Sequence, residues 1–173
     1  MASDERTFHL LLDAFSLKHL PRTGWVRMGA PNESVADHSF GTAVIALALA
    51  KMEELTAADE ALLLKAALLH DLHEAKLGDL TPDEKKAAKP DEEGTEREMA
   101  KDTHLEGVLP FHLSTKLAIL LTDADKLDML FRAIENANAG NAKMGEFISS
   151  ALQQIKSESG KRLSKLALAR LRK

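Results

Sequence analysis

Apolar residues recur at three- and four-residue steps along almost the whole chain, and this periodicity constrains the fold more than any other feature. The clearest stretch follows Ser114 and ends near Asn138. Its expected apolar face consists of Leu117, Leu120, Leu121, Ala124, Leu127, Phe131 and Ile134. This spacing aligns side chains on one face of an α-helix, and no segment shows the strand-like alternation of β-branched residues. The sequence therefore predicts an all-α protein.

Proline, glycine and short polar segments separate the expected helices. These helices cover about residues 4–18, 36–50, 57–75, 82–89, 96–107, 115–138, 143–156 and 161–172. An irregular loop before the second helix is indicated by Pro21, Gly24, Gly29 and Pro31. A chain of 173 residues suffices for one core, and there is no internal repeat or long linker. We expect a single helical-bundle domain over residues 1–173, with its main motifs in about 17–131 and C-terminal helices in about 143–172.

Net charge and cysteine content exclude several classes of function. The net charge is −4 and the isoelectric point about 6.0, whereas a nucleic-acid polymer requires a clustered positive field. Cysteine is absent, which excludes disulfides, thiolate metal sites and cysteine nucleophiles. There is no run of about eighteen apolar residues, so we expect no membrane span. The N-terminus lacks the features of a signal peptide, and we expect a cytoplasmic location.

The segment from Leu68 to Leu80 places polar residues beside some of the most apolar sequence in the chain. In a helix, His70 and Glu74 share a face, while Asp71 projects about 100° away from His70. Polar groups are costly to bury without partners. A metal ion is one candidate partner for these three side chains. His73 lies off their face, and we expect it in solvent or behind the ligands.

Other expected helices supply further candidates for the same metal site. His38 lies in the first turn of the second helix, where a capping or packing role is the alternative. The long helix carries Asp123, Asp125 and Asp128 on different faces, and we expect Asp123 to be an exposed charge. Two imidazoles and two carboxylates form a site for Mn, Fe, Co, Ni, Zn or Mg. Four protein ligands leave positions for water and a substrate oxygen.

The order of these residues resembles a known family. His38, the His70–Asp71 doublet and Asp125 match the H…HD…D pattern of the HD-domain metal-dependent phosphohydrolases. The flanking sequences are similar to the branch that contains the 5'-deoxynucleotidases and the HD-domain-containing protein 2 group. They are Pro-Arg-Thr-Gly-Trp-Val, Ser-Val-Ala-Asp-His-Ser, Leu-Leu-His-Asp-Leu-His-Glu-Ala-Lys-Leu-Gly-Asp-Leu-Thr-Pro and Asp-Ala-Asp-Lys-Leu-Asp, within about residues 17–131. The resemblance implies one divalent metal ion held by His38, His70, Asp71 and Asp125.

Roles for five further residues follow from the resemblance and from their chemistry. Glu74 is expected to position or deprotonate the attacking water, and Asp79 to protonate the leaving oxygen or hold the sugar hydroxyl. Arg22 is the expected phosphate ligand, because guanidinium binds phosphate through two N–H groups, and Arg27 is the alternative. Trp25 is expected to pack against the sugar and disfavour a 2'-hydroxyl, with a core position as the alternative.

Together these residues predict hydrolysis of a nucleoside 5'-monophosphate, most simply a deoxynucleotide, to nucleoside and phosphate. The chain has no Gly-rich phosphate loop or Gly-x-Ser-x-Gly motif, so direct attack by water is the simplest route. One alternative is an HD phosphohydrolase acting on another nucleotide or phosphate ester. The other is a non-catalytic nucleotide- or metal-binding module. The resemblance further implies a homodimer, for which the apolar C-terminal helices are the expected interface.

Overall fold

The computed structural model describes residues 3–30 and 33–172, and in these ranges it contains helices and no β-strand. Pro31, which the sequence assigned to a loop, lies outside them. The elements are α1 (Ser3–Ser16), α2 (Thr23–Arg27), α3 (Val35–Met52), α4 (Ala57–Leu69), α5 (Glu74–Leu77), α6 (Pro82–Ala88), α7 (Glu92–Ala100), α8 (Thr115–Asn138), η1 (Ala142–Met144), α9 (Gly145–Gln154) and α10 (Glu158–Leu168). The prediction of an all-α protein is confirmed.

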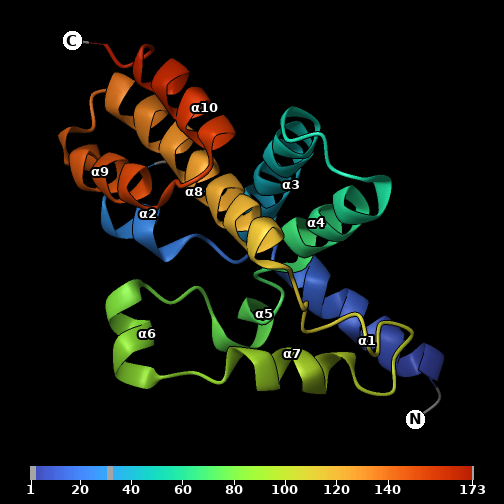
Figure 1. The fold of residues 1–173 in the computed structure, drawn as a ribbon. Coiled ribbons are helices and arrows are strands. Elements are labelled where there is room, and N and C mark those ends of the chain that lie inside the picture. Colours follow the sequence, from blue (N-terminus) through green and yellow to red (C-terminus); the bar gives the residue numbers. More distant parts are fainter. Residues whose placement is uncertain (1–2, 31–32, 173) are drawn as a thin grey trace.

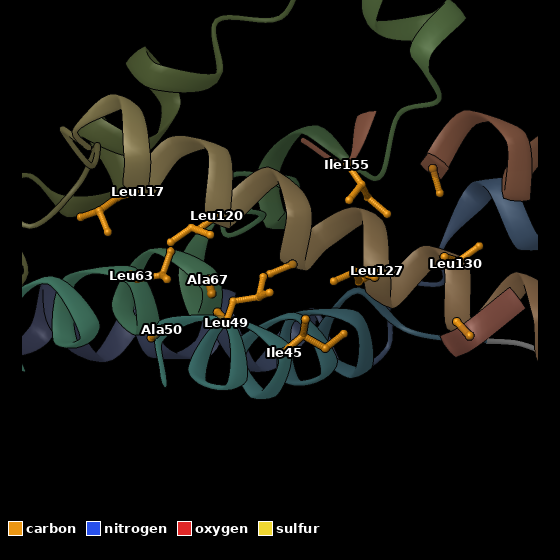
Figure 2. Close-up of a cluster of buried hydrophobic side chains, with 14 of the residues drawn as sticks. Ile45, Leu49, Ala50, Leu63, Ala67, Leu117, Leu120, Leu127, Leu130 and Ile155 are labelled. Carbon is orange, nitrogen blue, oxygen red and sulfur yellow. The ribbon is translucent and has the colours of Figure 1, made fainter. Parts of the chain in front are cut away.

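Helix α8 forms the centre of the molecule and contacts α3, α4, α9 and α10 (Figure 1). Its leucines Leu120 and Leu127 meet Leu49 of α3 and Leu63 of α4 in the main core (Figure 2), and none of the four is more than 1% exposed. Burying one leucine side chain contributes about 1.5–3 kcal/mol. Phe131 was expected on the same apolar face but is 40% exposed, because it lines a groove between α8 and α10.

A capping box fixes the start of α3. The Ser34 hydroxyl accepts the Asp37 N–H at 3.1 Å, and the Asp37 carboxylate accepts the Ser34 N–H at 3.0 Å. This reciprocal pair satisfies two backbone donors that the first turn of a helix leaves without partners. His38 is the next residue, so the cap sets the position from which its ring enters the molecule.

Helix α3 is the one helix of the described ranges that is long and apolar enough to cross a membrane by length and composition. Polar residues such as Asp37 and His38 interrupt its sequence, so it contains no unbroken apolar run of this length. Core helices of globular proteins share it, and in this fold α3 packs against α4 and α8. The residues of α3 that enter the main core are Ile45, Ala46, Leu49 and Ala50.

The polar segment after Leu69 lies on a turn and not on a continuous helix. α4 ends at Leu69 with His70 as its C-cap, and α5 begins only at Glu74. The expectation of one helix across this segment is therefore wrong. Gly78 ends α5 with a φ of 79°, a backbone conformation that glycine adopts without strain. Non-helical backbone therefore lies on both sides of α5, and the successive side chains of the segment do not follow one helical face.

Two other elements differ from the sequence prediction. The expected irregular loop contains a short helix, α2, which carries Trp25 and Arg27. Helix α7 covers Glu92–Ala100 and not about 96–107. It begins early because the Asp91 side chain accepts the Gly94 N–H at 2.9 Å and caps the helix.

Helices α1, α5 and α7 form a second layer, in which α1 packs against both α5 and α7 (Figure 1). The buried apolar residues of this layer are Leu10, Leu17, Val35, Leu72, Ala100 and Leu109. Leu72 comes from the turn between α4 and α5 and is 2% exposed. The buried Leu72 side chain holds the turn in place, and with it the polar residues on either side of Leu72.

Candidate metal centre

The imidazole rings of His38 and His70 each direct their Nε2 atom into the same space. The ring centroids of His38, on α3, and His70, at the end of α4, lie 5.3 Å apart. His38 Nδ1 lies 2.6 Å from Asp128 Oδ2, and His70 Nδ1 lies 2.9 Å from the Ala67 carbonyl oxygen. Both acceptors favour a proton on Nδ1, which leaves the Nε2 lone pair of a neutral ring free. Among the described residues, neither buried Nε2 atom has a hydrogen-bond partner.

Asp71 and Asp125 each bring a carboxylate oxygen to these nitrogens. Asp71 Oδ2 lies 3.3 Å from His70 Nε2 and 3.7 Å from His38 Nε2. Asp125 Oδ1, on α8, lies 3.4 Å from His38 Nε2. The structure thus brings together the four residues that the sequence selected as metal ligands, from two helices and the turn after α4.

This set of donor atoms fits a divalent metal ion. Buried polar atoms are normally hydrogen-bonded, so two unpartnered imidazole nitrogens beside two carboxylates require a positively charged partner. Each imidazole is held through its other nitrogen by an acceptor, the arrangement that metal-binding histidines usually show. Nitrogen and carboxylate oxygen ligands accept Mn, Fe, Co, Ni, Zn or Mg, and they leave the identity of the ion open.

Charges within the cluster shift the pKa values of its members. Burial disfavours the charged form of His38, but the neighbouring carboxylates of Asp125 and Asp128 outweigh it and raise its pKa to about 9. Burial lowers the pKa of His70. Burial also disfavours the Asp125 carboxylate, yet His38 and the charge of Lys126 hold the pKa of Asp125 well below its ordinary value. A proton and a metal ion therefore compete for His38 Nε2.

Glu74 lies beside the cluster in a different environment. It is 2% exposed, and its Oε2 has no hydrogen-bond partner in the described part of the chain. Burial and then the charges of Asp71 and Asp79 raise the pKa of Glu74 to about 9. Positive charge placed at Asp71 favours the ionised form of Glu74. The ionised carboxylate is the form that a general base requires.

Arg22 and Asp79 connect the segment before α2 with the segment after α5. Arg22 Nη1 donates to Asp79 Oδ1 at 3.0 Å and to Asp71 Oδ2 at 3.2 Å. Thr23 donates its N–H to Asp79 Oδ2 at 2.5 Å and its hydroxyl to the Asp79 carbonyl oxygen at 2.6 Å. Both carboxylate oxygens of Asp79 therefore have a donor, and a guanidinium lies directly against a carboxylate of the metal centre.

The structure does not bring Arg27 and Trp25 to the cluster. Arg27 lies on the surface, where its Nη2 donates to Glu84 Oε1 at 2.5 Å. Trp25 is 3% exposed, and its ring packs on Phe147 with the centroids 4.5 Å apart. A ring enclosed in this way has no free face for a sugar, so the alternative of a core position describes Trp25. Of the two candidate arginines, only Arg22 contacts a candidate metal ligand.

The three aspartates of α8 have separate surroundings. Asp125 faces His38 Nε2, whereas Asp128 contacts the opposite ring nitrogen. Asp123 is fully buried and accepts the backbone N–H groups of Lys156 at 2.7 Å and Ser157 at 2.8 Å. The expectation that Asp123 is an exposed charge is therefore wrong. The spacing along one helix indicated that these residues face different ways, but it did not show what each would meet.

Two neighbours of the cluster have contacts that sequence reasoning did not identify. Lys126 Nζ lies 2.8 Å from Asp125 Oδ2, with 21% of its side chain exposed. A lysine on a helix is usually solvated, so the sequence carried no signal for this contact. His73 is 4% exposed, and its Nδ1 lies 3.1 Å from Glu96 Oε1 of α7. His73 thus lies behind the ligands, one of the two positions expected for it.

The fold and the metal centre together define the class of this protein. The family model described as HD domain matches residues 14–167, which contain all four candidate metal ligands. The chain therefore belongs to the HD domain family.

Relatives of known name lie close in sequence. The 5'-deoxynucleotidase HDDC2 of Xenopus laevis is 31% identical over 134 residues, which cover 69% of this chain and 63% of that protein. The 5'-deoxynucleotidase HDDC2 of Dictyostelium discoideum is 32% identical over 135 residues, which cover 69% of this chain and 71% of that protein. The chain thus matches less than two thirds of the length of the Xenopus relative.

Solved structures share the fold over almost the whole chain. A Pyrococcus horikoshii OT3 protein superposes with a TM-score of 0.75 and 30% identity, covering 94% of this chain and 97% of that one. A conserved hypothetical protein from Pyrococcus furiosus gives 0.71 and 32%, covering 94% and 98%. The cyanophage S-2L HD phosphohydrolase DatZ, solved with dA and one catalytic Zn²⁺ ion, gives 0.57 and 14%, covering 92% of both chains. At that identity the likeness to DatZ concerns the fold alone.

Proposed function

We propose that this chain is a metal-dependent phosphohydrolase that converts a deoxynucleoside 5'-monophosphate to a deoxynucleoside and phosphate. The observation that carries the proposal is the convergence of two unpartnered imidazole nitrogens and two carboxylates beside Glu74 and Arg22. A divalent ion held there polarises a phosphoryl oxygen and lowers the pKa of bound water. The names of the Xenopus and Dictyostelium relatives support a deoxynucleotide as substrate.

Two cations flank the candidate metal ligands and suit a phosphate. Arg22 Nη1 contacts Asp71 Oδ2 on one side, and Lys126 Nζ contacts Asp125 Oδ2 on the other. A phosphomonoester carries a charge of about −1.5 to −2 at neutral pH. Both side chains already neutralise carboxylates, so a phosphate would share them and add charge-assisted hydrogen bonds.

Glu74 and Asp79 are the candidates for proton transfer. Glu74 has a free buried oxygen, so it can accept a hydrogen bond from water and then its proton. Asp79 is the second candidate, but both of its carboxylate oxygens accept hydrogen bonds, from Arg22 and from Thr23, and these contacts favour binding of the sugar hydroxyl over protonation of the leaving oxygen. With Trp25 enclosed in the core, a preference for deoxyribose rests on the names of the relatives and has no residue assigned to it.

The experiment measures phosphate release from a panel of substrates by metal-free protein and by protein loaded with Mn, Fe, Co, Ni, Zn or Mg. The panel contains deoxynucleoside and nucleoside 5'-monophosphates, a deoxynucleoside triphosphate and simple phosphate esters. We expect turnover only with metal and fastest with a deoxynucleoside monophosphate. Turnover of only another ester would show that the proposed substrate is wrong. Metal binding without any turnover would indicate a non-catalytic module.

We also propose that the protein forms a homodimer. Helix α1 exposes a continuous apolar face, and its members, Phe8, Leu11, Leu12 and Phe15, are each 48–57% exposed. The C-terminal helices, the expected interface, expose Leu166. A face as apolar as that of α1 is a typical protein interaction site. Light scattering should report a dimer that Phe8→Glu dissociates and Leu166→Glu preserves; the reverse result would place the interface on the C-terminal helices.

A further inference from the structure

We propose that Gly41 and Asp128 act together as positioning residues for the metal ligand His38, and that Gly41 is glycine because the Asp128 carboxylate occupies the place of a side chain. The inference rests on the proposed metal centre and goes beyond its ligands. Gly41 follows His38 by three residues on α3, so both lie on the side of the helix that faces α8.

The first observation is the contact between Asp128 and the ring. Asp128 Oδ2 lies 2.6 Å from His38 Nδ1, and the ring is 1% exposed. While Asp128 is in place, the carboxylate and not water is therefore the partner of Nδ1. A carboxylate at Nδ1 fixes which nitrogen carries the proton and in which direction Nε2 points, and it increases the basicity of the ligand.

The second observation concerns the other oxygen of the same carboxylate. A Cβ atom built on Gly41 would lie 1.9 Å from Asp128 Oδ1 and 2.9 Å from Asp128 Cγ. Contacts this short do not occur, so a side chain at position 41 must displace the carboxylate. Asp128 is held at its other end by the ring of His38 and has little freedom to move. The carboxylate thus reaches its hydrogen bond only because α3 has no side chain at Gly41.

Gly94 and Gly160 also lie against an aspartate carboxylate, but both are in the first turn of their helices, α7 and α10, whereas Gly41 lies inside α3. Gly145 begins α9, and a Cβ there would meet no atom within 4 Å. Glycine inside a helix is less favourable than alanine because it loses more backbone freedom on folding. Gly41 lies in the middle of α3 and therefore bears this cost. The space that the Asp128 carboxylate occupies explains why glycine stands there despite this cost.

An ion pair between Glu33 and Arg132 lies next to the contact between Asp128 and His38. Glu33, Asp128 and His38 place their polar atoms within 4.8 Å of one another, and Arg132 Nε lies 2.9 Å from Glu33 Oε2. Burial and the charge of Asp128 raise the pKa of Glu33. Arg132 follows Asp128 by one turn of α8, so its contact with Glu33 also fixes the rotation of that helix. The position of the carboxylate is therefore set from both sides.

The test is the affinity of the metal-free protein for Mn²⁺ and Co²⁺, measured by calorimetry in one buffer for every variant, with melting curves to monitor folding. Loss of such an outer contact typically weakens metal binding about 10–100-fold. We expect this loss for Gly41→Ala and for Asp128→Ala. We expect a smaller loss for Asp128→Asn, which keeps an oxygen for Nδ1. Gly145→Ala is the matched control and should bind as the unsubstituted chain does.

The double variant gives the sharpest result. If Gly41→Ala acts by displacing the carboxylate, it should weaken binding no further in a chain that already carries Asp128→Ala. Losses that multiply, or a Gly41→Ala chain with unchanged affinity, would overturn the proposal. Should Gly41→Ala fail to fold, equal affinities of Asp128→Ala and the unsubstituted chain would overturn it instead. A chain that shows the expected pattern but hydrolyses no nucleotide would overturn the proposed function and leave the positioning role standing.

Discussion

The metal centre has two halves that are built in different ways. His38 and Asp125 stand on the long helices α3 and α8, which pack along each other through the main core. His70, Asp71 and Glu74 stand on a turn between α4 and α5, and Arg22 and Asp79 come from further non-helical segments. The helical half is held by apolar packing, whereas the turn half is held by the single buried Leu72 together with hydrogen bonds and ion pairs.

This difference assigns different work to the two halves. A helix presents two ligands in a fixed direction, but it cannot direct neighbouring side chains to the same point. The turn after α4 can, and it places Asp71 within reach of His70 on one side and of Glu74 on the other. We therefore expect substitutions in the helical half to act mainly on metal affinity. The turn half adds two ligands, and there we expect a separate effect on turnover and substrate binding from substitutions of Glu74 and Arg22, which are not ligands.

The largest effect that separates the halves is expected for Glu74→Gln. General-base catalysis contributes about 10²–10⁴-fold, so kcat should fall by that factor. Metal affinity should change little, because the four expected ligands remain. Steady-state kinetics and calorimetry of the same preparation measure both. A fall in metal affinity as large as the fall in kcat would assign Glu74 to the ligands and remove the distinction.

A smaller effect is expected for Arg22→Met. A hydrogen bond to a charged group contributes about 1.5–3 kcal/mol, so KM for a nucleoside monophosphate should rise about 10–100-fold. Asp71 would also lose a cation, which leaves metal affinity unchanged or higher. Competition by inorganic phosphate measures the same contact without turnover. Equal inhibition constants for the variant and the unsubstituted chain would contradict phosphate binding by Arg22.

The pH dependence of stability should separate the halves in the metal-free protein. The pKa values of Glu74 and His38 are both raised to about 9 in the folded state. The folded protein then binds more protons than the unfolded one, so stability falls as pH rises. For Glu74 the fall begins near its ordinary pKa of 4.5, and for His38 near 6.5. Above about pH 9 both contributions to stability are lost.

Urea unfolding of metal-free protein across this range provides the measurement. Glu74→Gln should reduce the slope between about pH 4.5 and 6.5, where Glu74 contributes and His38 does not yet, and should leave the slope that His38 contributes above 6.5. The difference between the two chains removes the contribution of all other groups. Parallel curves over the whole range would show that Glu74 titrates at an ordinary pKa in the folded protein.

The smallest effect is expected for Arg27→Met, which matches Arg22→Met in chemistry but lies outside both halves. Arg27 pairs with Glu84 on the surface, with 51% of its side chain exposed. Surface ion pairs contribute about 0–1 kcal/mol, so the melting temperature should change little. KM and kcat should stay within about twofold of the unsubstituted values. A rise in KM comparable to that of Arg22→Met would restore Arg27 as the phosphate ligand.

The sequence predicted the helical half of the site better than the turn half, for physical reasons. Helical periodicity is a local property, and it placed His38 and Asp125 on helices as observed. The same periodicity extended α4 across His70, because the turn there carries neither proline nor glycine before Gly78. The burial of Leu72 in the second layer is a tertiary contact, and such contacts override local preference.

Side-chain environment was the other limit of sequence reasoning. Trp25 was assigned to the sugar by resemblance and Asp123 to the surface by its usual role. Both are buried by segments distant in the chain, Phe147 and the residues before α10. Asp128 was expected on a different face of the long helix from Asp125, but its contact with His38 depends on the packing of α8 on α3. The pattern thus identifies which residues converge, and the fold decides how each is oriented.

Asp123 has a consequence for where an autonomous folding unit of this chain ends. Its carboxylate accepts two backbone N–H groups at the start of α10, and Gly160 lies so close that a Cβ there would meet Asp123 Oδ2 at 2.5 Å. A fragment truncated after α8 would keep every ligand of the metal centre, yet Asp123 would lose both backbone donors and the main core would lose Ala151, Ile155 and Ala167. Each square ångström of apolar core surface left uncovered costs about 25 cal/mol. The C-terminal helices are therefore part of the smallest fragment that can hold the metal, although they contribute no ligand to it.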